Sequence, residues 1–543
     1  MKKVVTLFLA VLMMIAVSAC GGRKINNNPT DKPSIVLRYY EAGYGSEYME
    51  EQVKAFNAHA SKGEYDFYVS AIGDPAIAQT IGSLLEQSKM SDSVVMPDVV
   101  ITTSLGFITN GIKGDIACLD SVFATEVETA ASATGKMTIE NKLSDAVIEK
   151  YDVLGHYYAL PLQAGTTGIV YNKKLFNEYG LTEPQTMAEM WELMEDIDNL
   201  PRNNDSSVNN DICAMIYPSM AVDYWKYVTE AYWGQLLGLE ARNEYNELVN
   251  ADVKVVEYQK YYEAIFNNVI SFSNSGPGDV HALTTSSSHT LTLAAFAQQK
   301  ALMTICGDWV VNEIGGAMNK ADLGFMLTPL ICDVNTKKVI AKATPYSEVF
   351  AGVNMGDSSA VAAAEDKYIK VERSKVDASV IPSEDASRDY IYFRKVTYSN
   401  VGQVNGIVPA KAKNVEYAKQ FLAFLATDEA LDIYYKKTGA WLPFNYNFTE
   451  SDAVAAGLPE LTVKTQHLGL VADSIIDIYR SKGRVYNLMD VMRGSGADYI
   501  VRLLQGKTTA NALYNDIRSG VTGAYASLSD DIRIYEAANE ITY

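Results

Sequence analysis

The chain has 543 residues, of which 48% are hydrophobic and 21% are charged, a composition typical of a folded globular protein and unlike that of a disordered one. It carries 46 basic and 66 acidic residues, and the formal net charge of −20 argues against general nucleic-acid binding because an acidic surface repels phosphate backbones. The 35 tyrosines outnumber the 16 phenylalanines and 5 tryptophans. A tyrosine ring has an apolar body and a polar tip, which suits a surface that binds something polar. We expect most of these tyrosines, however, to be ordinary core-edge or surface residues.

The beginning of the chain has the features of an export signal. Lys2 and Lys3 precede an apolar run over residues 4–17, and small residues follow immediately before Cys20. This order is typical of a secretory signal peptide, and the run is shorter than the roughly 20 residues of a membrane span. We therefore expect residues 1–19 to be a signal peptide. The ending Val-Ser-Ala-Cys resembles the bacterial lipobox, which predicts lipidation of Cys20.

The chain that follows the signal peptide is expected to be a folded body on a tether. Loss of the two positive charges of Lys2 and Lys3 changes the net charge from −20 to −22. Residues 20–33 are polar and lack a hydrophobic period, so they predict a flexible tether. Disulfides and buried free thiols are both open for the other cysteines, with free thiols favoured, and no spacing predicts a metal site. These cysteines are Cys118, Cys213, Cys306 and Cys332.

The first part of the body alternates short strands with amphipathic helices. Residues 35–40 predict a strand, and Ser46 predicts the N-cap of a helix with acidic residues in its first turn. Met49, Val53 and Phe56 fall on one face of that helix. Further strands are expected at residues 65–70 and 98–102. This alternation favours an α/β architecture.

The same alternation continues in the remainder of the chain. Thr186 and Glu189 form a capping box that begins another helix, and residues 415–425 predict one more. Residues 273–289 predict a long loop, and residues 357–389, which show no clear apolar face, predict a surface insertion. The other expected strands are residues 168–172, 214–217, 301–305, 323–327 and 351–354.

No motif for catalysis stands out. The five histidines form neither an HExxH motif nor a paired metal spacing, and His289 lacks a GxSxG turn, so we interpret it as part of a solvated loop. Residues 504–508 imitate the end of a phosphate-binding loop, but Val501 stands where that loop needs glycine. Chance carboxylate pairs are plentiful among 66 acidic residues, and none is singled out for glycoside hydrolysis. The sequence therefore indicates no catalytic residue, cofactor or metal.

Several segments together resemble one protein family. The strongest is Tyr-Ala-Leu-Pro-Leu-Gln at residues 158–163, followed by Thr-Gly-Ile-Val-Tyr-Asn-Lys-Lys-Leu-Phe at residues 167–176 and then by Gly-Leu, Pro and Thr. A second runs over residues 295–303 into Gly-Asp-Trp at 307–309, with Gln299 where the family usually has glycine. With residues 96–100, 323–329 and 421–430 in the expected order, the stretch of about 34–445 resembles the family 1 extracellular solute-binding proteins of ABC importers, relatives of maltose-binding protein.

The resemblance implies an α/β fold of the two-lobed periplasmic-binding-protein type (type II), whose lobes are joined by a multi-crossing hinge. Such proteins bind without turnover. The ligand favours the closed form, because it contacts both lobes only when the hinge is closed. The crossings are expected near residues 160–166, 329–345 and 438–443. Lobe 1 would then comprise residues 34–163 and 345–437, and lobe 2 residues 166–328 and 440–543.

The resemblance also suggests ligand-binding residues in the second lobe. Trp309 matches the family's ligand-stacking tryptophan, with a plain core role as the alternative, and Asp308 beside it can accept hydrogen bonds from hydroxyl groups. Asp223 and Tyr224 follow the strand at residues 214–217, where relatives place sugar contacts.

Further candidates lie in the first lobe and at the crossings. Glu41 and Tyr44 occupy the first strand-to-helix loop, where helix capping or a surface position is equally open. Thr102 and Thr103 stand where sugar-binding relatives often have Trp and Asp, which puts a maltodextrin-type ligand in doubt. Two more candidates could instead be hinge packing, Gln163 and Trp441, and Asp98 is expected to be structural.

The resemblance therefore implies an exported binding protein that is lipid-anchored at Cys20 on the extracytoplasmic face of a bacterial cell membrane. It would capture a mono- or oligosaccharide and deliver it to ABC transporter permease subunits, with no enzymatic activity, no cofactor and no nucleic-acid partner. Two alternatives stay open at this point: a surface lipoprotein enzyme that degrades glycans, and a non-transport ligand-sensing lipoprotein on the same fold.

Overall fold

The protein is described by a computed structural model with two compact units. Unit 1 comprises Met1–Gln163, Gln403–Lys437 and Pro443–Asn447, and unit 2 comprises Ala164–Gly402, Thr438–Leu442 and Phe448–Tyr543. The structure describes residues 24–25, 32–41, 43–103, 106–143, 147–148, 151–200, 212–218, 223–237, 256–272, 288–341, 352–354, 356–373, 398–440, 443–446, 450–471, 475–477 and 499–519. The expected signal peptide, Cys20 and Trp441 lie outside these residues.

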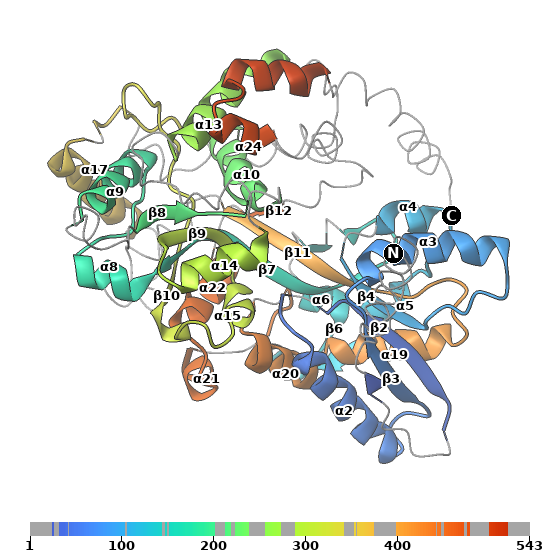
Figure 1. Ribbon diagram of the computed structural model, residues 1–543. Helices are drawn as coiled ribbons and strands as arrows, with labels where there is room; N and C mark the ends of the chain where they lie inside the picture. The colour runs from blue at the N-terminus through green and yellow to red at the C-terminus, as the bar shows by residue number, and fades with distance from the viewer. Residues whose placement is uncertain are drawn as a thin grey trace, which may run out of the picture. The chain divides into compact units, whose positions relative to one another are not determined.

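Unit 1 is built on a mostly parallel sheet (Figure 1). Strand β2 (Ser34–Tyr39) lies between β3 (Tyr68–Gly73) and β4 (Val99–Thr102) and is parallel to both. The short strand β1 (Lys24–Ile25), which falls within the expected tether, pairs antiparallel with β3, and residues 405–407 pair antiparallel with β4. The unit's other elements are α2 (Glu47–Ser61), α3 (Ile77–Met90), α4 (Phe107–Ile112), α5 (Asp120–Phe123), β5 (Glu126–Glu128), β6 (Lys136–Thr138), α6 (Ile139–Lys142), α19 (Val415–Leu425) and α20 (Asp428–Thr438).

Helix α2 confirms the predicted amphipathic pattern. Met49, Val53 and Phe56 are all buried, with at most 2% of their surface exposed. The Phe56 ring lies 5.2 Å from the Phe421 ring and 5.3 Å from the Phe424 ring, between centroids, so the apolar face of α2 packs on α19. Ser46 is the N-cap as predicted, but its side chain makes no capping hydrogen bond.

Asp98 fixes the beginning of β4, which confirms its predicted structural role. The carboxylate is 4% exposed. Its Oδ2 accepts from the Val36 N–H at 2.8 Å, and its Oδ1 accepts from the N–H of Asn414, the N-cap of α19, at 2.9 Å. Charge-assisted bonds of this kind tie the strand to the helix that covers it.

His59 joins the end of α2 to the beginning of α20. Its Nδ1 lies 2.7 Å from the Glu64 Oε2, and its Nε2 lies 2.7 Å from the Glu429 Oε2. The hydrogen bonds to Glu429 and Glu64 raise the pKa of His59 above its ordinary value, and they outweigh partial burial. The imidazolium form is thus favoured in the folded protein.

The His59 contacts predict a pH-dependent contribution to stability. Because the folded pKa is raised, the contribution is fully present below the unfolded pKa of about 6.5 and is lost as pH rises through the folded value. We expect the stabilisation of the wild type over His59→Gln to be larger at pH 6 than at pH 8, measured by urea unfolding at both values. An equal difference at the two pH values would contradict this assignment.

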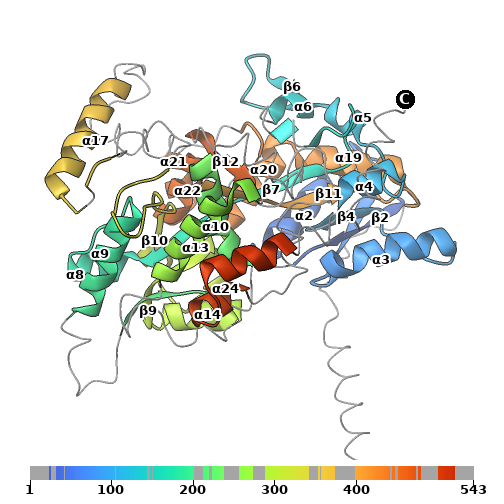
Figure 2. The ribbon, with the colours of Figure 1, turned by 90° about the horizontal axis from the view of Figure 1, so that it is seen from above.

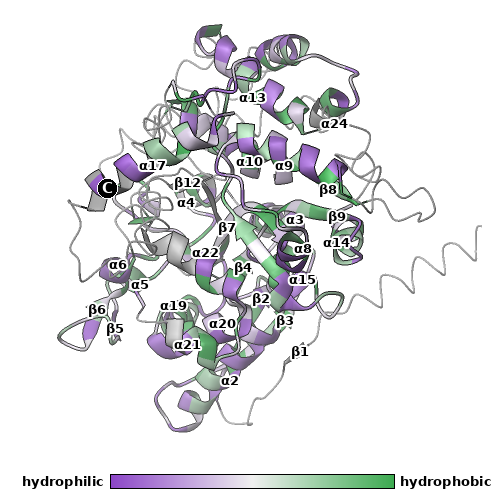
Figure 3. Cartoon of the chain, turned by 90° about the vertical axis from the view of Figure 1, so that its left-hand side faces the viewer, coloured by the Kyte–Doolittle hydropathy of each residue, from purple (hydrophilic) through white to green (hydrophobic). Residues whose placement is uncertain are grey.

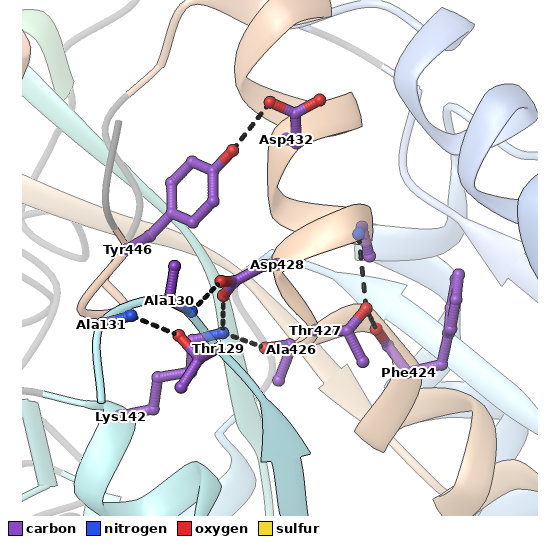
Figure 4. Close-up of polar contacts among 11 residues, drawn as sticks. Thr129, Ala130, Ala131, Lys142, Phe424, Ala426, Thr427, Asp428, Asp432 and Tyr446 are labelled. Carbon is purple, nitrogen blue, oxygen red and sulfur yellow. Dashed lines mark hydrogen bonds and ion pairs between the residues drawn. The ribbon is translucent and has the colours of Figure 1, made fainter. Parts of the chain in front are cut away.

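A buried lysine holds the turn between α19 and α20 (Figure 4). The Lys142 side chain, at the end of α6, is 0% exposed. Its Nζ donates to the Ala426 carbonyl at 2.9 Å and pairs with the Asp428 Oδ1 at 2.5 Å. Asp428 also accepts from the Ala130 N–H at 2.7 Å, so one carboxylate binds both α6 and the segment after β5.

Unit 2 has a mixed sheet around β7 (Leu160–Asn172), which begins in unit 1 (Figure 1). Strands β9 (Ala301–Gly307) and β10 (Leu323–Met326) pair antiparallel with β7, and β8 (Cys213–Ile216) pairs parallel with β9. All residues of β8 and β9 are buried, and Figure 3 shows these strands mainly in the green of hydrophobic residues. Covered faces explain why both sequences are apolar runs rather than alternating ones.

Helices surround this sheet. Thr186 caps α9 as predicted, because its hydroxyl accepts from the Glu189 N–H at 3.3 Å, while the Glu189 carboxylate accepts from the Gln185 N–H at 2.7 Å. Helix α10 packs on α13, and α13 packs on α24 (Figures 1 and 2). The unit's remaining helices and strands are α8 (Lys173–Tyr179), α9 (Met187–Asp198), α10 (Asp223–Leu237), α13 (Gln259–Ser271), α14 (His289–Ala297), α15 (Val310–Glu313), the 3-10 helix η2 (Lys320–Asp322), α17 (Ser358–Arg373), α21 (Glu450–Ala455), α22 (Glu460–Val471), β12 (Ile475–Asp477) and α24 (Tyr499–Leu504).

Among the described strands, β7 and β11 (Tyr398–Ile407) cross from one unit to the other. The described residues 352–354, 356–373 and 398–402 belong to unit 2, although the predicted lobe 1 includes residues 345–437, and the lobe boundaries stay a prediction. The strand predicted at residues 351–354 is wrong for the described residues 352–354, since Gly352 has a φ of +80°, which interrupts an extended backbone. Within the described part of the chain, every helix is too short or too polar to traverse a lipid bilayer.

Candidate functional site

A group of polar and aromatic side chains in unit 2 begins at the end of β9, where Gly307, Asp308 and Trp309 follow one another. The Trp309 ring lies directly over Gly307, because a Cβ on that glycine would be only 2.3 Å from the ring. Glycine is therefore the residue that lets the indole fold back on the strand end. The indole is 3% exposed and is held against the unit's interior.

Two tyrosines from α10 contact this indole. The Trp309 Nε1–H donates to the Tyr224 hydroxyl at 3.2 Å, and the two rings meet edge to face at 6.3 Å between centroids. The Tyr227 ring meets the indole edge to face at 5.7 Å. Because residues three apart lie on the same side of a helix, α10 presents both rings to Trp309. The structure thus brings together two predicted site residues that are 85 positions apart.

A histidine and a carboxylate extend the group. His289 Nε2 lies 3.1 Å from the Tyr224 hydroxyl and also makes a short contact with the Glu313 Oε2. The His289 and Tyr224 rings lie 4.7 Å apart between centroids. We call Tyr224, Tyr227, His289, Trp309 and Glu313 the aromatic cluster. Tyr227 and Trp309 are buried and support the cluster, whereas Tyr224 and His289 are half-buried. The accessible part thus combines rings with hydroxyl, imidazole and carboxylate groups, which suits a ligand that has both apolar C–H faces and hydroxyl groups.

His289 and Glu313 are not among the site residues predicted from the sequence. His289 is the first residue of α14 rather than part of a solvated loop, since the Ser288 hydroxyl accepts from the Leu291 N–H at 3.4 Å and caps the helix. A serine directly before an apolar run was the available signal for this helix start. Nothing local marks Glu313, because its contact with His289 joins residues 24 positions apart.

Asp308 faces the backbone of β7. The carboxylate is 2% exposed, and its Oδ2 accepts from the Thr166 N–H at 3.3 Å. In return, the Asp308 N–H donates to the Thr166 carbonyl at 3.0 Å. These bonds fix Asp308, and with it the beginning of the segment that carries Trp309, to β7, and hydrogen bonding to a ligand stays a prediction for Asp308.

Three candidates of unit 1, Glu41, Thr102 and Thr103, lie at the carboxyl ends of the parallel strands β2 and β4. Such ends meet at one edge of a sheet, where α/β proteins commonly bind ligands. Glu41 follows β2, and its carboxylate lies against Gly73, where an added Cβ would be 2.4 Å from Oε2. Thr102 ends β4 and donates its hydroxyl to the carbonyl of Thr103, which is half-buried.

Gln163 and Tyr44 are linked through two other tyrosines. The Gln163 Nε2 donates to the Tyr48 hydroxyl at 2.9 Å. Tyr434 contacts the Tyr48 ring at 5.0 Å and the Tyr44 ring at 6.2 Å, both edge to face. Burial, with the nearby Tyr39, raises the pKa of Tyr48 well above its ordinary value, so its hydroxyl stays protonated. Of the remaining candidates, Asp223 begins α10, and only its backbone is described.

Comparison with known proteins places most of the chain in one group. Residues 51–460 match the family described as bacterial extracellular solute-binding protein. The multiple sugar-binding protein of Streptococcus mutans is 41% identical over 64 residues, which are 12% of this chain and 15% of that protein. This match thus spans a small part of the relative's length.

Solved structures resemble the whole fold. RafE of Streptococcus pneumoniae, in its apo form, is 15% identical with a TM-score of 0.58, covering 92% of this chain and 99% of that one. RafE in complex with raffinose is 16% identical with a TM-score of 0.56, covering 90% of this chain and 99% of that one. GacH of Streptomyces glaucescens, solved unliganded and with acarbose, is 15% identical with a TM-score of 0.57 and covers 92% of this chain and 100% of that one. These likenesses show the two-lobed α/β type II binding-protein fold.

Proposed function

Because this chain belongs to the bacterial extracellular solute-binding protein family, we propose that it is a receptor that captures a mono- or oligosaccharide and passes it to an ABC transporter permease. Capture occurs by hinge closure, without chemical turnover. The aromatic cluster is the observation that carries the proposal: Tyr224, His289 and Trp309 gather ring faces and polar atoms at the end of β9. Rings against C–H faces and polar atoms at hydroxyl groups are the contacts that a sugar requires.

The relatives support this ligand class. RafE binds raffinose and GacH binds acarbose, both carbohydrate-type ligands, and the short match to a sugar-binding protein points the same way. Thr102 and Thr103 stand where sugar-binding relatives often have Trp and Asp, which argues against a maltodextrin-type ligand.

The proposal includes the place of the protein in the cell. The expected signal peptide and lipobox support export and anchoring to the extracytoplasmic face of the cell membrane through Cys20. A labelled fatty acid should be incorporated into the wild-type protein but not into Cys20→Ala, which tests the anchor. Sugar uptake into vesicles that depends on added receptor tests the partnership with permease subunits.

We expect the purified chain without its signal peptide to bind at least one saccharide in calorimetry. The panel contains galactose, raffinose, cellobiose, maltotriose and a chitin oligosaccharide, with a set of amino acids as the control class. Binding confined to the amino acids would contradict the carbohydrate assignment. Chromatography of each mixture after long incubation tests for cleavage, and products that accumulate with time would instead identify a glycan-degrading enzyme.

A further inference from the structure

Unit 1 contains a group of three different metal-ligating side chains, Cys118, Asp120 and His156. One ligand atom of each lies within 4.8 Å of the ligand atoms of the other two. A metal-binding motif with short spacing in the sequence does not predict this group, because Asp120 and His156 are 36 positions apart and no cysteine lies close to a histidine in sequence. The fold brings them together by placing α5 beside the turn that precedes β7.

Backbone hydrogen bonds fix these two segments to each other. The Leu119 N–H donates to the Tyr157 carbonyl at 2.7 Å, and the Tyr157 N–H donates to the Asp120 Oδ1 at 2.8 Å. The other carboxylate oxygen, Oδ2, lies 2.7 Å from the His156 Nδ1. The Phe123 and Tyr157 rings stack at 3.9 Å between centroids. The carboxylate and the imidazole are therefore oriented before any ligand arrives.

The group is accessible and lies among charges of both signs. All three side chains are half-buried, so an ion can reach them from solvent. Burial raises the pKa of the Cys118 thiol, so a bound ion must displace the thiol proton. The nearby Lys419 ammonium, which pairs with Glu416 at 3.2 Å, acts in the opposite direction and favours the thiolate.

We propose that Cys118, Asp120 and His156 bind a divalent transition-metal ion of the zinc type. Thiolate, imidazole and carboxylate together match zinc, whereas calcium and magnesium prefer oxygen ligands alone. Three protein ligands leave the fourth tetrahedral position to water. On binding, the ion takes the place of the Cys118 thiol proton, which passes to solvent. The imidazole of His156 binds in its neutral form through Nδ1, and its one proton is then carried by Nε2. The ion ties α5 to the segment that leads into β7.

Cobalt(II) is the probe, because its thiolate complexes absorb strongly in the near ultraviolet. The full chain without its signal peptide is reduced, freed of metal with a chelator and titrated with cobalt. We expect a thiolate-to-cobalt band that saturates at one equivalent and disappears when zinc is added. Cys118→Ser should abolish the band, and His156→Gln should weaken cobalt affinity at least about tenfold, since even second-shell changes cost that much.

Two controls separate this site from other metal binding. Cys332→Ala removes a buried thiol elsewhere and should leave the band unchanged. His59→Gln removes the histidine that lies 2.7 Å from two glutamates, where cobalt can bind without a thiolate band. Circular dichroism verifies that each variant is folded. A wild type without the band, or a band that persists in folded Cys118→Ser, would overturn the proposal, and neither outcome bears on saccharide binding.

Discussion

Replacing Lys142 with methionine is expected to lower the free energy of unfolding by about 3 kcal/mol, the lower end of the range for removing one partner of a buried ion pair. The lysine side chain is 0% exposed, and its loss leaves the Ala426 carbonyl and the Asp428 carboxylate without their shared donor. The lower end applies because Asp428 is 26% exposed and keeps the bond from the Ala130 N–H.

We attribute this cost to the polar groups that are left without a partner, rather than to a strong ion pair. Burial lowers the pKa of Lys142, and the Asp428 carboxylate only partly offsets that effect. The pKa of Asp428 is also lowered, since hydrogen bonds from Lys142 and the Ala130 N–H exceed the effect of burial. The fold thus favours the charged carboxylate but not the charged amine. The contribution of the Asp428 carboxylate to stability is present above the unfolded Asp pKa of about 3.9, and it is lost as pH falls through the folded pKa.

Urea unfolding followed by circular dichroism measures the effect. A double variant, Lys142→Met with Asp428→Asn, should recover part of the loss because it leaves no buried charge unpaired. Lys437→Met is the matched control: its amine lies 3.7 Å from Glu47 on the surface, and its removal should change stability by about 0.5 kcal/mol or less. A Lys142→Met protein as stable as this control would contradict the account.

Local patterns predicted the elements whose signals are local. The Met49, Val53 and Phe56 face of α2 and the Thr186 cap of α9 depend on neighbours within one or two helical turns, and both are confirmed. Strand β7 is longer than predicted, because its first residues cross between the units and contain Pro161, Gln163 and Gly165, which weaken a strand signal in sequence.

The side-chain clusters depend on contacts that no spacing encodes. Cys118 meets His156, and Tyr224 meets Trp309, only after strands and helices have packed. The abundance of tyrosine was similarly uninformative, since Tyr217 and Tyr232 are fully buried and serve the core. Predictions for Trp309, Tyr224 and Gln163 came from the family resemblance, and the structure adds which atoms hold them in place.

Replacing Trp309 with alanine is expected to weaken saccharide binding at least about thirtyfold, or about 2 kcal/mol, the cost of removing a central aromatic anchor. This expectation rests on the proposed function. The indole anchors the Tyr224 hydroxyl through its Nε1–H and packs on Tyr227. Without it, the tyrosine rings and His289 lose the surface that orients them. Calorimetry with the saccharide found in the panel measures the change.

Because Trp309 is 3% exposed, the alanine variant also loses core packing, at a cost of about 3–5 kcal/mol in stability. Tyr224→Phe provides a milder variant, which keeps the ring and removes the hydroxyl that contacts both Trp309 and His289. We expect the Tyr224 hydroxyl to make one hydrogen bond to the saccharide, and its removal in Tyr224→Phe should lower affinity about threefold to tenfold. Trp233→Phe, on the same helix but packed on Tyr262 at 4.7 Å, should bind like the wild type.

A double-variant cycle distinguishes ligand stacking by Trp309 from positioning of Tyr224. Trp309→Phe keeps an aromatic face and removes the N–H that reaches the tyrosine hydroxyl. If the indole acts only by holding Tyr224, then Trp309→Phe added to Tyr224→Phe changes affinity no further, because the positioned hydroxyl is already absent. If the indole itself stacks on the sugar, the smaller ring lowers affinity again and the two losses add. Unchanged affinity in folded Trp309→Ala would remove the residue from the site altogether.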